Sequence, residues 1–477
     1  MKLRKFAGQG GFGIGALVVE KGAAFLLIVL LARVLPTETY GIYSFTVAYL
    51  TLFQVLADFG LEPILVRRLS APDADRPQIL SAALGLRLGL ALGSASLAVL
   101  LAPWVSGEGL SIVPVILLGC GSLLFLAQPG FRAVLRSELR LGAVFLVATF
   151  TASLTLAGVF LATRQEGGLL AVWTAYAVAT WAGLGLAALL VSRSFRLQVR
   201  IAPDVWRSLL AESWPVGANL LVLMMGLRAG AIVLMQTAGP DAVGLYASAA
   251  RLSEASNLLG EGTMLVIFPL LARLGPSRAE DLQALAGLTA KMLAIALCFT
   301  ALVGGALADP LVRGLFGERF AASGPVLAIL LWSGPFAAVG TLYANLLVIT
   351  GHQRLLLGVN AGSAAVLILL QLLLVPSYGI QGAAFGVVVG FAAGHVLLLL
   401  PAATRKVIWP CCREALRPMA LALACLMFSA SYDDGPMKAL IALGFFSLAL
   451  LGTRTLSIRD LKALRVALRD GSSDVSR

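Results

Sequence analysis

The chain has 477 residues, of which 59% are hydrophobic and only 13% are charged. Soluble proteins carry about 25% charged residues, so this chain has too few to cover a surface that faces water. Apolar runs near 20 residues recur along the whole length, each long enough to cross a hydrocarbon core about 30 Å thick. The composition excludes a soluble protein and predicts an all-α protein that crosses a membrane many times.

Fourteen apolar segments are predicted to be membrane helices, and a count of twelve, without the last two, stays open. The predicted helices lie near residues 12–35, 40–60, 80–104, 109–131, 141–163, 168–191, 210–238, 242–269, 284–308, 323–349, 355–375, 381–400, 416–431 and 437–453.

The net charge of +12 lies in the short loops between these helices, which argues against a compact nucleic-acid-binding domain. If the N-terminus is inside the cell, 26 of the 36 Lys and Arg residues lie on the same side. This asymmetry predicts, by the positive-inside rule, a multi-pass protein of the cell (inner) membrane with both termini in the cytoplasm. The cysteines show no disulfide or metal-ligand spacing, and we expect no cofactor.

The chain also contains an internal repeat. LPTETYGIYS at 35–44 resembles GPDAVGLYAS at 239–248, and an offset of 203 or 204 residues relates four pairs of residues. These pairs are Gly41 with Gly244, Tyr43 with Tyr246, Asp58 with Glu261, and Arg87 with Lys291. Two six-helix copies in the same orientation predict a two-lobed bundle with the substrate path between the lobes.

The predicted organisation therefore has four parts. Residues 1–208 and 209–405 form the two six-helix lobes, 406–453 form two extra membrane helices, and 454–477 form a basic amphipathic tail on the cytoplasmic surface. A literal G-x-G-x-x-G match, GQGGFG at 8–13, follows no strand and is rejected as a dinucleotide site.

Charged residues inside the predicted helices are the candidate site. The basic ones are Lys21, Arg87, Arg228, Arg251 and Lys291, and the acidic ones are Glu20, Asp58, Glu254 and Glu261. A charge at mid-membrane costs between about 2.5 and over 10 kcal/mol, so such residues usually face a protein interior or a watery cavity. We expect the cations to line a substrate cavity and the carboxylates to be candidates for binding H⁺ or Na⁺.

Plainer interpretations of the same residues stay open. Glu20 could pair with Lys21 of its own helix, and Arg251 could pair with Glu254. Arg87 and Lys291 lie about two turns from the cytoplasmic edge, where long side chains can extend to the surface. Asp58 and Glu261 could simply be polar groups at helix ends.

Three segments resemble one family. FLLIVLLARVLPTETYGIYSFTVAYLTLFQVLADFGLEPILVRRL at 25–69, GPDAVGLYASAARLSE at 239–254 and TGHQRLLLGVNAGSAAVLILLQLLLVPSYGIQGAAFG at 350–386 are similar to polysaccharide-biosynthesis flippases. These flippases belong to the multidrug/oligosaccharidyl-lipid/polysaccharide (MOP) exporter superfamily. The resemblance implies a MATE-like pair of lobes that opens alternately to each side of the membrane.

The resemblance also implies a substrate, a polyprenyl-pyrophosphate-linked oligosaccharide moved from the cytoplasmic to the outer leaflet. Its expected partners are membrane lipids and polysaccharide-assembly proteins. Lys21 and Arg251 match the places of cavity cations in relatives that flip such lipids, whereas Glu20 and Glu254 depart from a purely cationic cavity.

Two other functions remain as alternatives. A multidrug exporter of the same fold would favour an acidic or aromatic cavity, which the five in-membrane cations disfavour. A polysaccharide polymerase or glycosyltransferase needs a sizeable outer loop with catalytic residues, and no such constellation is found. We therefore expect a transporter rather than an enzyme.

Overall fold

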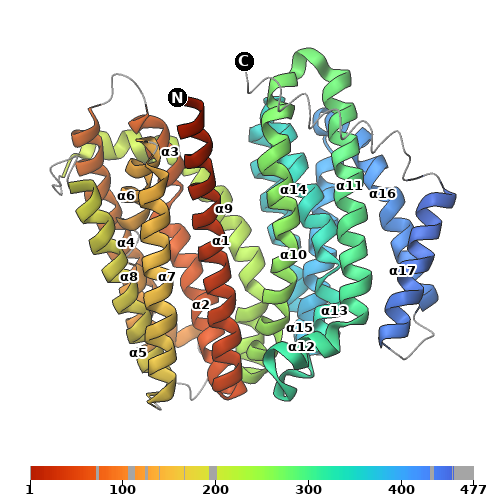
Figure 1. Cartoon of the computed structure of the whole chain (residues 1–477), viewed down its shortest axis with the longest axis horizontal. Helices are drawn as coiled ribbons and strands as arrows, with labels where there is room; N and C mark the ends of the chain where they lie inside the picture. Colours follow the sequence, from red (N-terminus) through yellow and green to blue (C-terminus); the bar gives the residue numbers. More distant parts are fainter. Residues whose placement is uncertain are drawn as a thin grey trace. The chain divides into compact units, whose positions relative to one another are not determined.

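Long apolar helices make up the protein, as the composition predicts (Figure 1). A computed structural model describes residues 2–70, 75–105, 113–123, 127–138, 140–165, 167–192, 201–429, 435–453 and 455. Every regular element in these ranges is a helix, because only a helix satisfies all of its backbone groups within one membrane-crossing segment. The predicted tail at 454–477 lies, apart from Thr455, outside the described residues.

The helices follow the predicted segments in chain order. They are α1 (Lys2–Val34), α2 (Thr37–Asp58), α3 (Leu61–Leu69), α4 (Arg76–Val105), α5 (Val113–Leu123), α6 (Ala127–Ser137), α7 (Leu141–Arg164), α8 (Gly168–Ser192), α9 (Pro203–Thr237), α10 (Gly239–Leu274), α11 (Ala279–Ala306), α12 (Ala308–Phe316), α13 (Ser323–Leu330), α14 (Ser333–Ile349), α15 (Gln353–Leu399), α16 (Ala402–Ser429) and α17 (Gly435–Gly452), with short 3₁₀ turns at Pro276–Arg278 and Glu318–Phe320.

Ten helical segments in the described part of the chain are long and apolar enough to cross a membrane. One of them, 355–399, contains two of the predicted spans, 355–375 and 381–400. Its backbone leaves the helical conformation at Gly379, where φ is +53° and ψ is −132°. Because glycine adopts a positive φ without steric cost, the chain can turn there.

The two arms of α15 pack against each other as an antiparallel hairpin. Gln371 is buried and its Nε2 donates a hydrogen bond to the Ala383 carbonyl, 3.1 Å away. A Cβ added at Gly390 would lie 2.7 Å from Leu367, and one at Gly394 would lie 2.9 Å from Ser363. Glycines every four residues on the second arm therefore allow the close approach that packs helices in membranes.

One predicted span is interrupted in the structure, and another is described only in part. The span predicted at 323–349 consists of α13 and α14, separated by Leu331 and Trp332. The span predicted at 109–131 is described as α5 and α6, with 124–126 outside the described residues. The apolar pattern runs through Leu331 and Trp332, so hydropathy alone predicts a single helix there.

Two repeat-related glycines lie against each other where α2 and α10 begin. A Cβ at Gly41 would lie 1.8 Å from the Pro240 carbonyl oxygen, and one at Gly244 would lie 2.7 Å from the Thr37 carbonyl oxygen. Any larger residue would push the two backbones apart. The glycine that the repeat carries at both positions is explained by this contact.

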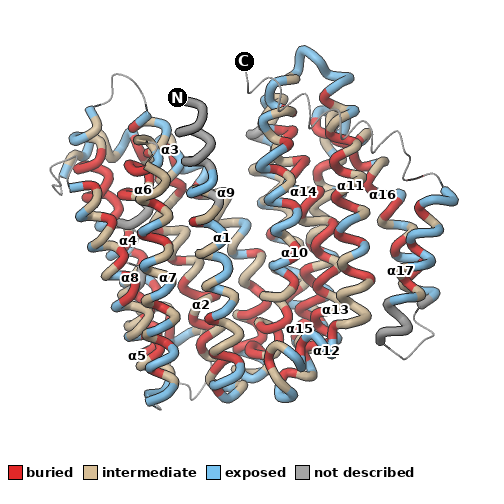
Figure 2. The backbone as a smooth tube through the Cα atoms, in the orientation of Figure 1, coloured by how far each residue is buried: buried red, intermediate tan, exposed pale blue. Residues whose placement is uncertain are grey.

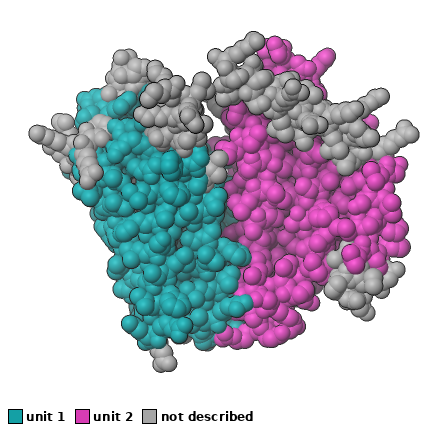
Figure 3. Space-filling view, viewed as in Figure 1, with its two compact units in different colours: residues 1–244 teal, residues 245–477 magenta. Residues whose placement is uncertain are grey.

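The chain divides into two compact units, residues 1–244 (unit 1) and 245–477 (unit 2) (Figure 3). Helix α9 packs along α2, α3 and α4 and is therefore grouped with unit 1. This division differs from the predicted lobe boundary at 208/209, which stays a prediction. In unit 2, buried residues recur along α11 and pack with α14 and α16 (Figure 2).

Candidate functional site

Glu20 and Lys21, adjacent in α1, have different surroundings. The Glu20 carboxylate forms an ion pair with the Arg132 guanidinium of α6, and the two side chains are 37% and 17% exposed. Lys21 is exposed, and no ion-pair partner for it is found among the described residues. The alternative in which Glu20 and Lys21 neutralise each other is therefore wrong, because the Glu20 carboxylate forms its ion pair with Arg132.

Asp58 ends α2 and forms an ion pair with Arg87 of α4. Arg87 Nη2 lies 2.5 Å from Asp58 Oδ1, and the Arg87 side chain is fully buried. The alternative in which Arg87 extends to the surface is therefore wrong. The backbone turns directly after this pair, since Phe59 and Gly60 both have positive φ.

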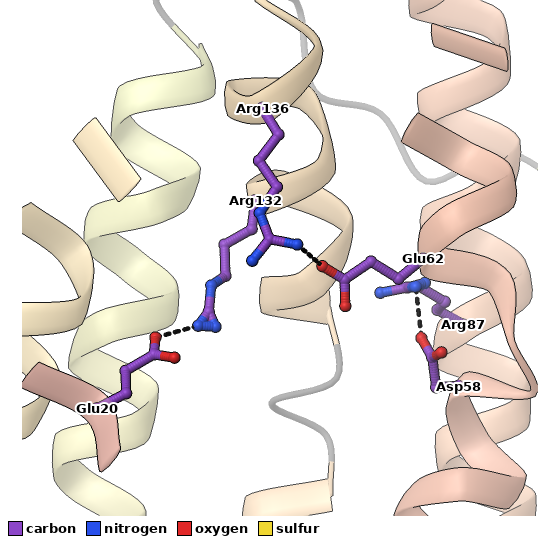
Figure 4. Close-up of polar contacts among 6 residues, drawn as sticks. All are labelled: Glu20, Asp58, Glu62, Arg87, Arg132 and Arg136. Carbon is purple, nitrogen blue, oxygen red and sulfur yellow. Dashed lines mark hydrogen bonds and ion pairs between the residues drawn. The ribbon is translucent and has the colours of Figure 1, made fainter. Parts of the chain in front are cut away.

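A third pair extends the same network. Glu62, at the start of α3, lies 2.6 Å from Arg136 of α6. Figure 4 shows the three carboxylates and three guanidiniums together; they come from α1, α2, α3, α4 and α6, and their formal charges cancel. Lys21 is therefore a charge in excess of a balanced set.

Sequence reasoning missed Arg132, Arg136 and Glu62 as members of this network. Arg132 and Arg136 lie just beyond the span predicted at 109–131, so the sequence places both in a cytoplasmic loop. The available signal was their spacing, because residues four apart share one face of a helix. Partners for that face cannot be read from sequence, since Glu20 and Glu62 are more than 70 residues away.

A second group ties α3 to α9 within unit 1. Arg67 and Arg68 both form ion pairs with Glu212, and Arg68 also donates a hydrogen bond to the Ser208 hydroxyl. Arg67 remains 68% exposed, which is typical of a cation at the edge of the membrane.

The candidates of unit 2 lie mainly on α10 and α11. Arg251 Nη1 lies 2.9 Å from Glu254 Oε2 one helical turn away, which confirms the internal pair allowed above. Lys291 of α11 pairs with Glu414 of α16 at 3.0 Å, a partner that the sequence did not indicate. Glu261 is exposed on α10, and Arg228 is half-buried on α9 in unit 1.

The repeat relates Asp58 to Glu261 and Arg87 to Lys291, yet their ion pairs differ. Arg87 pairs with Asp58, whereas the pair found for Lys291 is with Glu414 on α16, a helix that lies outside the repeat. The charges that the predicted repeat matches therefore form different ion pairs in the described part of the chain.

A comparison with protein-family models identifies the family of this chain. The model described as "Polysaccharide biosynthesis protein" matches residues 11–275, more than half of the chain. The chain belongs to this family. The resemblance found in the sequence is confirmed. A comparison with curated proteins gave no match.

Comparison with solved structures shows that this chain has the fold of MOP-superfamily transporters. The lipid II flippase MurJ in an inward closed conformation is similar with a TM-score of 0.74 and 13% identity, over 93% of this chain and 98% of that one. An inward-facing multidrug resistance MATE transporter of the MOP superfamily gives 0.62 and 15%, over 84% and 99%. The MATE multidrug transporter DinF-BH gives 0.62 and 15%, over 85% and 94%. The predicted MATE-like, all-helical fold of a multi-pass membrane protein is confirmed.

Proposed function

We propose that this protein is a flippase that moves a polyprenyl-pyrophosphate-linked oligosaccharide from the cytoplasmic to the outer leaflet by alternating access. Membership of the polysaccharide biosynthesis family and the fold shared with MurJ support a lipid-linked saccharide as cargo. The pyrophosphate cannot cross hydrocarbon unaided, so the protein supplies a polar chamber with positive charge.

The observation that carries this proposal is the exposed Lys21. It lies ten residues inside the apolar segment 11–34, or about 15 Å along the helix, which is about half-way across the membrane. An ammonium group there is costly without an anionic partner or water. Glu20 is engaged by Arg132, so a substrate phosphate is the fitting counter-charge.

The other candidate residues have different roles in this proposal, either contacting cargo or supporting the chamber. Arg251 and Arg228 are further contacts for phosphate or sugar, while Arg87 and Lys291, held by Asp58 and Glu414, shape the chamber rather than bind cargo. Among the coupling carboxylates, Glu20, Asp58 and Glu254 each have a guanidinium partner. The exposed Glu261 is therefore our first candidate for binding H⁺ or Na⁺.

A multidrug exporter is the second candidate function. The observation that favours it is the pair of exposed carboxylates on α10, Glu254 and Glu261, because carboxylates suit organic cations. The two functions differ in what accumulates when the protein is missing. Depletion of a flippase leaves a lipid-linked oligosaccharide in the inner leaflet, whereas depletion of an exporter makes cells drug-sensitive without such a build-up.

The direct test is substitution of Lys21. We expect Lys21→Ala to abolish polysaccharide export and to cause the lipid-linked oligosaccharide to accumulate, as measured by mass spectrometry of membrane lipids. Lys21→Arg keeps the charge and should retain part of the export, and Arg251→Ala should lose it.

The control is Arg207→Ala, which removes an exposed cation at the start of α9 and should leave export unchanged. Immunoblots of isolated membranes check that every variant is inserted in equal amount. Normal export by inserted Lys21→Ala protein would contradict the role of Lys21.

A further inference from the structure

The first half of α16 has two opposite faces. Ile408, Cys411, Cys412 and Ala415 are buried in the core of unit 2 with residues of α10, α11 and α14. The opposite face is exposed and carries cations and two large apolar side chains. Its residues are Arg405, Lys406, Trp409, Arg413, Leu416 and Arg417.

The spacing of the exposed residues makes a continuous surface. Arg405, Trp409, Arg413 and Arg417 follow one another four residues apart, so each lies one turn beyond the last on the same face. Trp409 is 50% exposed and Leu416 is 48% exposed, although both are large and apolar. We call this surface the α16 basic face.

No negative charge compensates the α16 basic face from its own helix. Glu414 is the single acidic residue in the sequence of α16. Its carboxylate lies 3.0 Å from Lys291 Nζ of α11 and is directed to the core side. Four cations therefore share one exposed face, and no ion-pair partner for them is found among the described residues. Such a face favours an anionic partner.

The position of the α16 basic face along the chain indicates the chemistry of its partner. Arg405, Lys406 and Arg413 precede the predicted span 416–431 and Arg417 lies at its start, on the side where most Lys and Arg residues lie. About four or more cations immediately cytoplasmic of a membrane helix are a typical recognition site for anionic lipids. Tryptophan is enriched at the depth of lipid headgroups, where its ring meets acyl chains and its N–H meets water.

We propose that the α16 basic face binds the phosphate headgroups of anionic phospholipids in the cytoplasmic leaflet, with Trp409 packed among their upper acyl chains. Arg413 and Arg417 reach back toward the headgroups from the start of the span, since long side chains extend to the interface. This lipid site is independent of the substrate path proposed above.

The test is native mass spectrometry of the purified full-length protein in a neutral detergent, titrated with phosphatidylglycerol or with phosphatidylethanolamine. We expect the unmodified protein to retain phosphatidylglycerol preferentially. The triple variant Arg405→Gln/Lys406→Gln/Arg413→Gln should bind it about tenfold or more weakly, because each cation near the surface contributes to the attraction.

The matched control neutralises three other exposed cations on the same predicted side, Arg207, Arg273 and Arg278. Arg207→Gln/Arg273→Gln/Arg278→Gln has the same net charge as the α16 variant and should keep the preference. Trp409→Ala should weaken retention of both lipids. The single variant Arg405→Gln, at the exposed start of the helix, serves if the triple variant loses its fold.

Three outcomes would overturn the proposal. The α16 variants could retain phosphatidylglycerol as tightly as the unmodified protein. The control triple could lose as much affinity as the α16 triple, so that net charge alone decides. Polyprenyl pyrophosphate could displace phosphatidylglycerol from this face at equal concentration, which would make the face a substrate site.

Discussion

Among single residues, Arg132 decides the charge that α1 presents. Without Arg132, the negative charge of Glu20 would lie next to Lys21 and partly neutralise its positive charge. By engaging Glu20, Arg132 leaves the Lys21 ammonium available to an anionic ligand. The ion pair thus joins a packing role, between α1 and α6, to the electrostatics of the proposed substrate contact.

This argument predicts charge rescue. Arg132→Gln leaves Glu20 without its partner, so the melting temperature in detergent and the export of polysaccharide should both fall. Adding Glu20→Gln should restore most of both, with a coupling energy of about 1–3 kcal/mol in the double-mutant cycle. If the two changes add without coupling, the pair has no such role.

The three ion pairs of this network differ in burial, so the melting temperatures of their variants can be ranked. Substitution of an arginine by Gln leaves its partner carboxylate uncompensated, and the side chains of Asp58, Glu62 and Glu20 are 22%, 29% and 37% exposed. Because an uncompensated charge costs more as it is more deeply buried, the loss of melting temperature should decrease in the order Arg87→Gln, Arg136→Gln, Arg132→Gln.

For the helices, the sequence predicts where a helix occurs better than where its backbone turns or is interrupted. Hydropathy located the helices, and the turn of α15 at Gly379 separates two predicted spans. The end of α2 at Asp58 agrees with the helix predicted at 40–60, whereas the short helix α3 that follows it was not predicted. The interruption between α13 and α14 was missed because Leu331 and Trp332 continue the apolar pattern. Charged candidates were likewise found by type, whereas Glu414 and Arg132 became visible as partners only when distant helices packed together.

The hairpin of α15 makes a test of stability. A Cβ at Gly382 would lie 2.3 Å from the Leu374 carbonyl oxygen, so Gly382→Ala must separate the arms near their turn. We expect a loss of about 1–3 kcal/mol, typical of overpacking, seen as a lower melting temperature in detergent. Gly358→Ala is the control in the same hairpin, because nothing lies within 4 Å of its added Cβ. Equal melting temperatures for both variants would argue against the tight hairpin.

For the whole molecule, orientation connects the charges to the transport direction. The positive-inside asymmetry assigns the α16 basic face and the Arg67–Arg68–Glu212 group to the cytoplasmic side. In the flippase proposed above, the cytoplasmic leaflet is the one from which cargo enters. The prediction is open to direct measurement because α11 separates two exposed sites, Arg278 before it and Glu318 beyond it.

We expect Arg278→Cys to react with a membrane-impermeant thiol reagent only after cells are permeabilised, and Glu318→Cys to react in intact cells. All five native cysteines are buried, so the unmodified protein should give little background. Glu318 is suitable because its side chain is 76% exposed, and its ion pair with Arg313 is a surface pair of small energetic value. Labelling in the opposite order would reverse the orientation, place the α16 basic face outside the cell, and leave the proposed lipid contact without its leaflet.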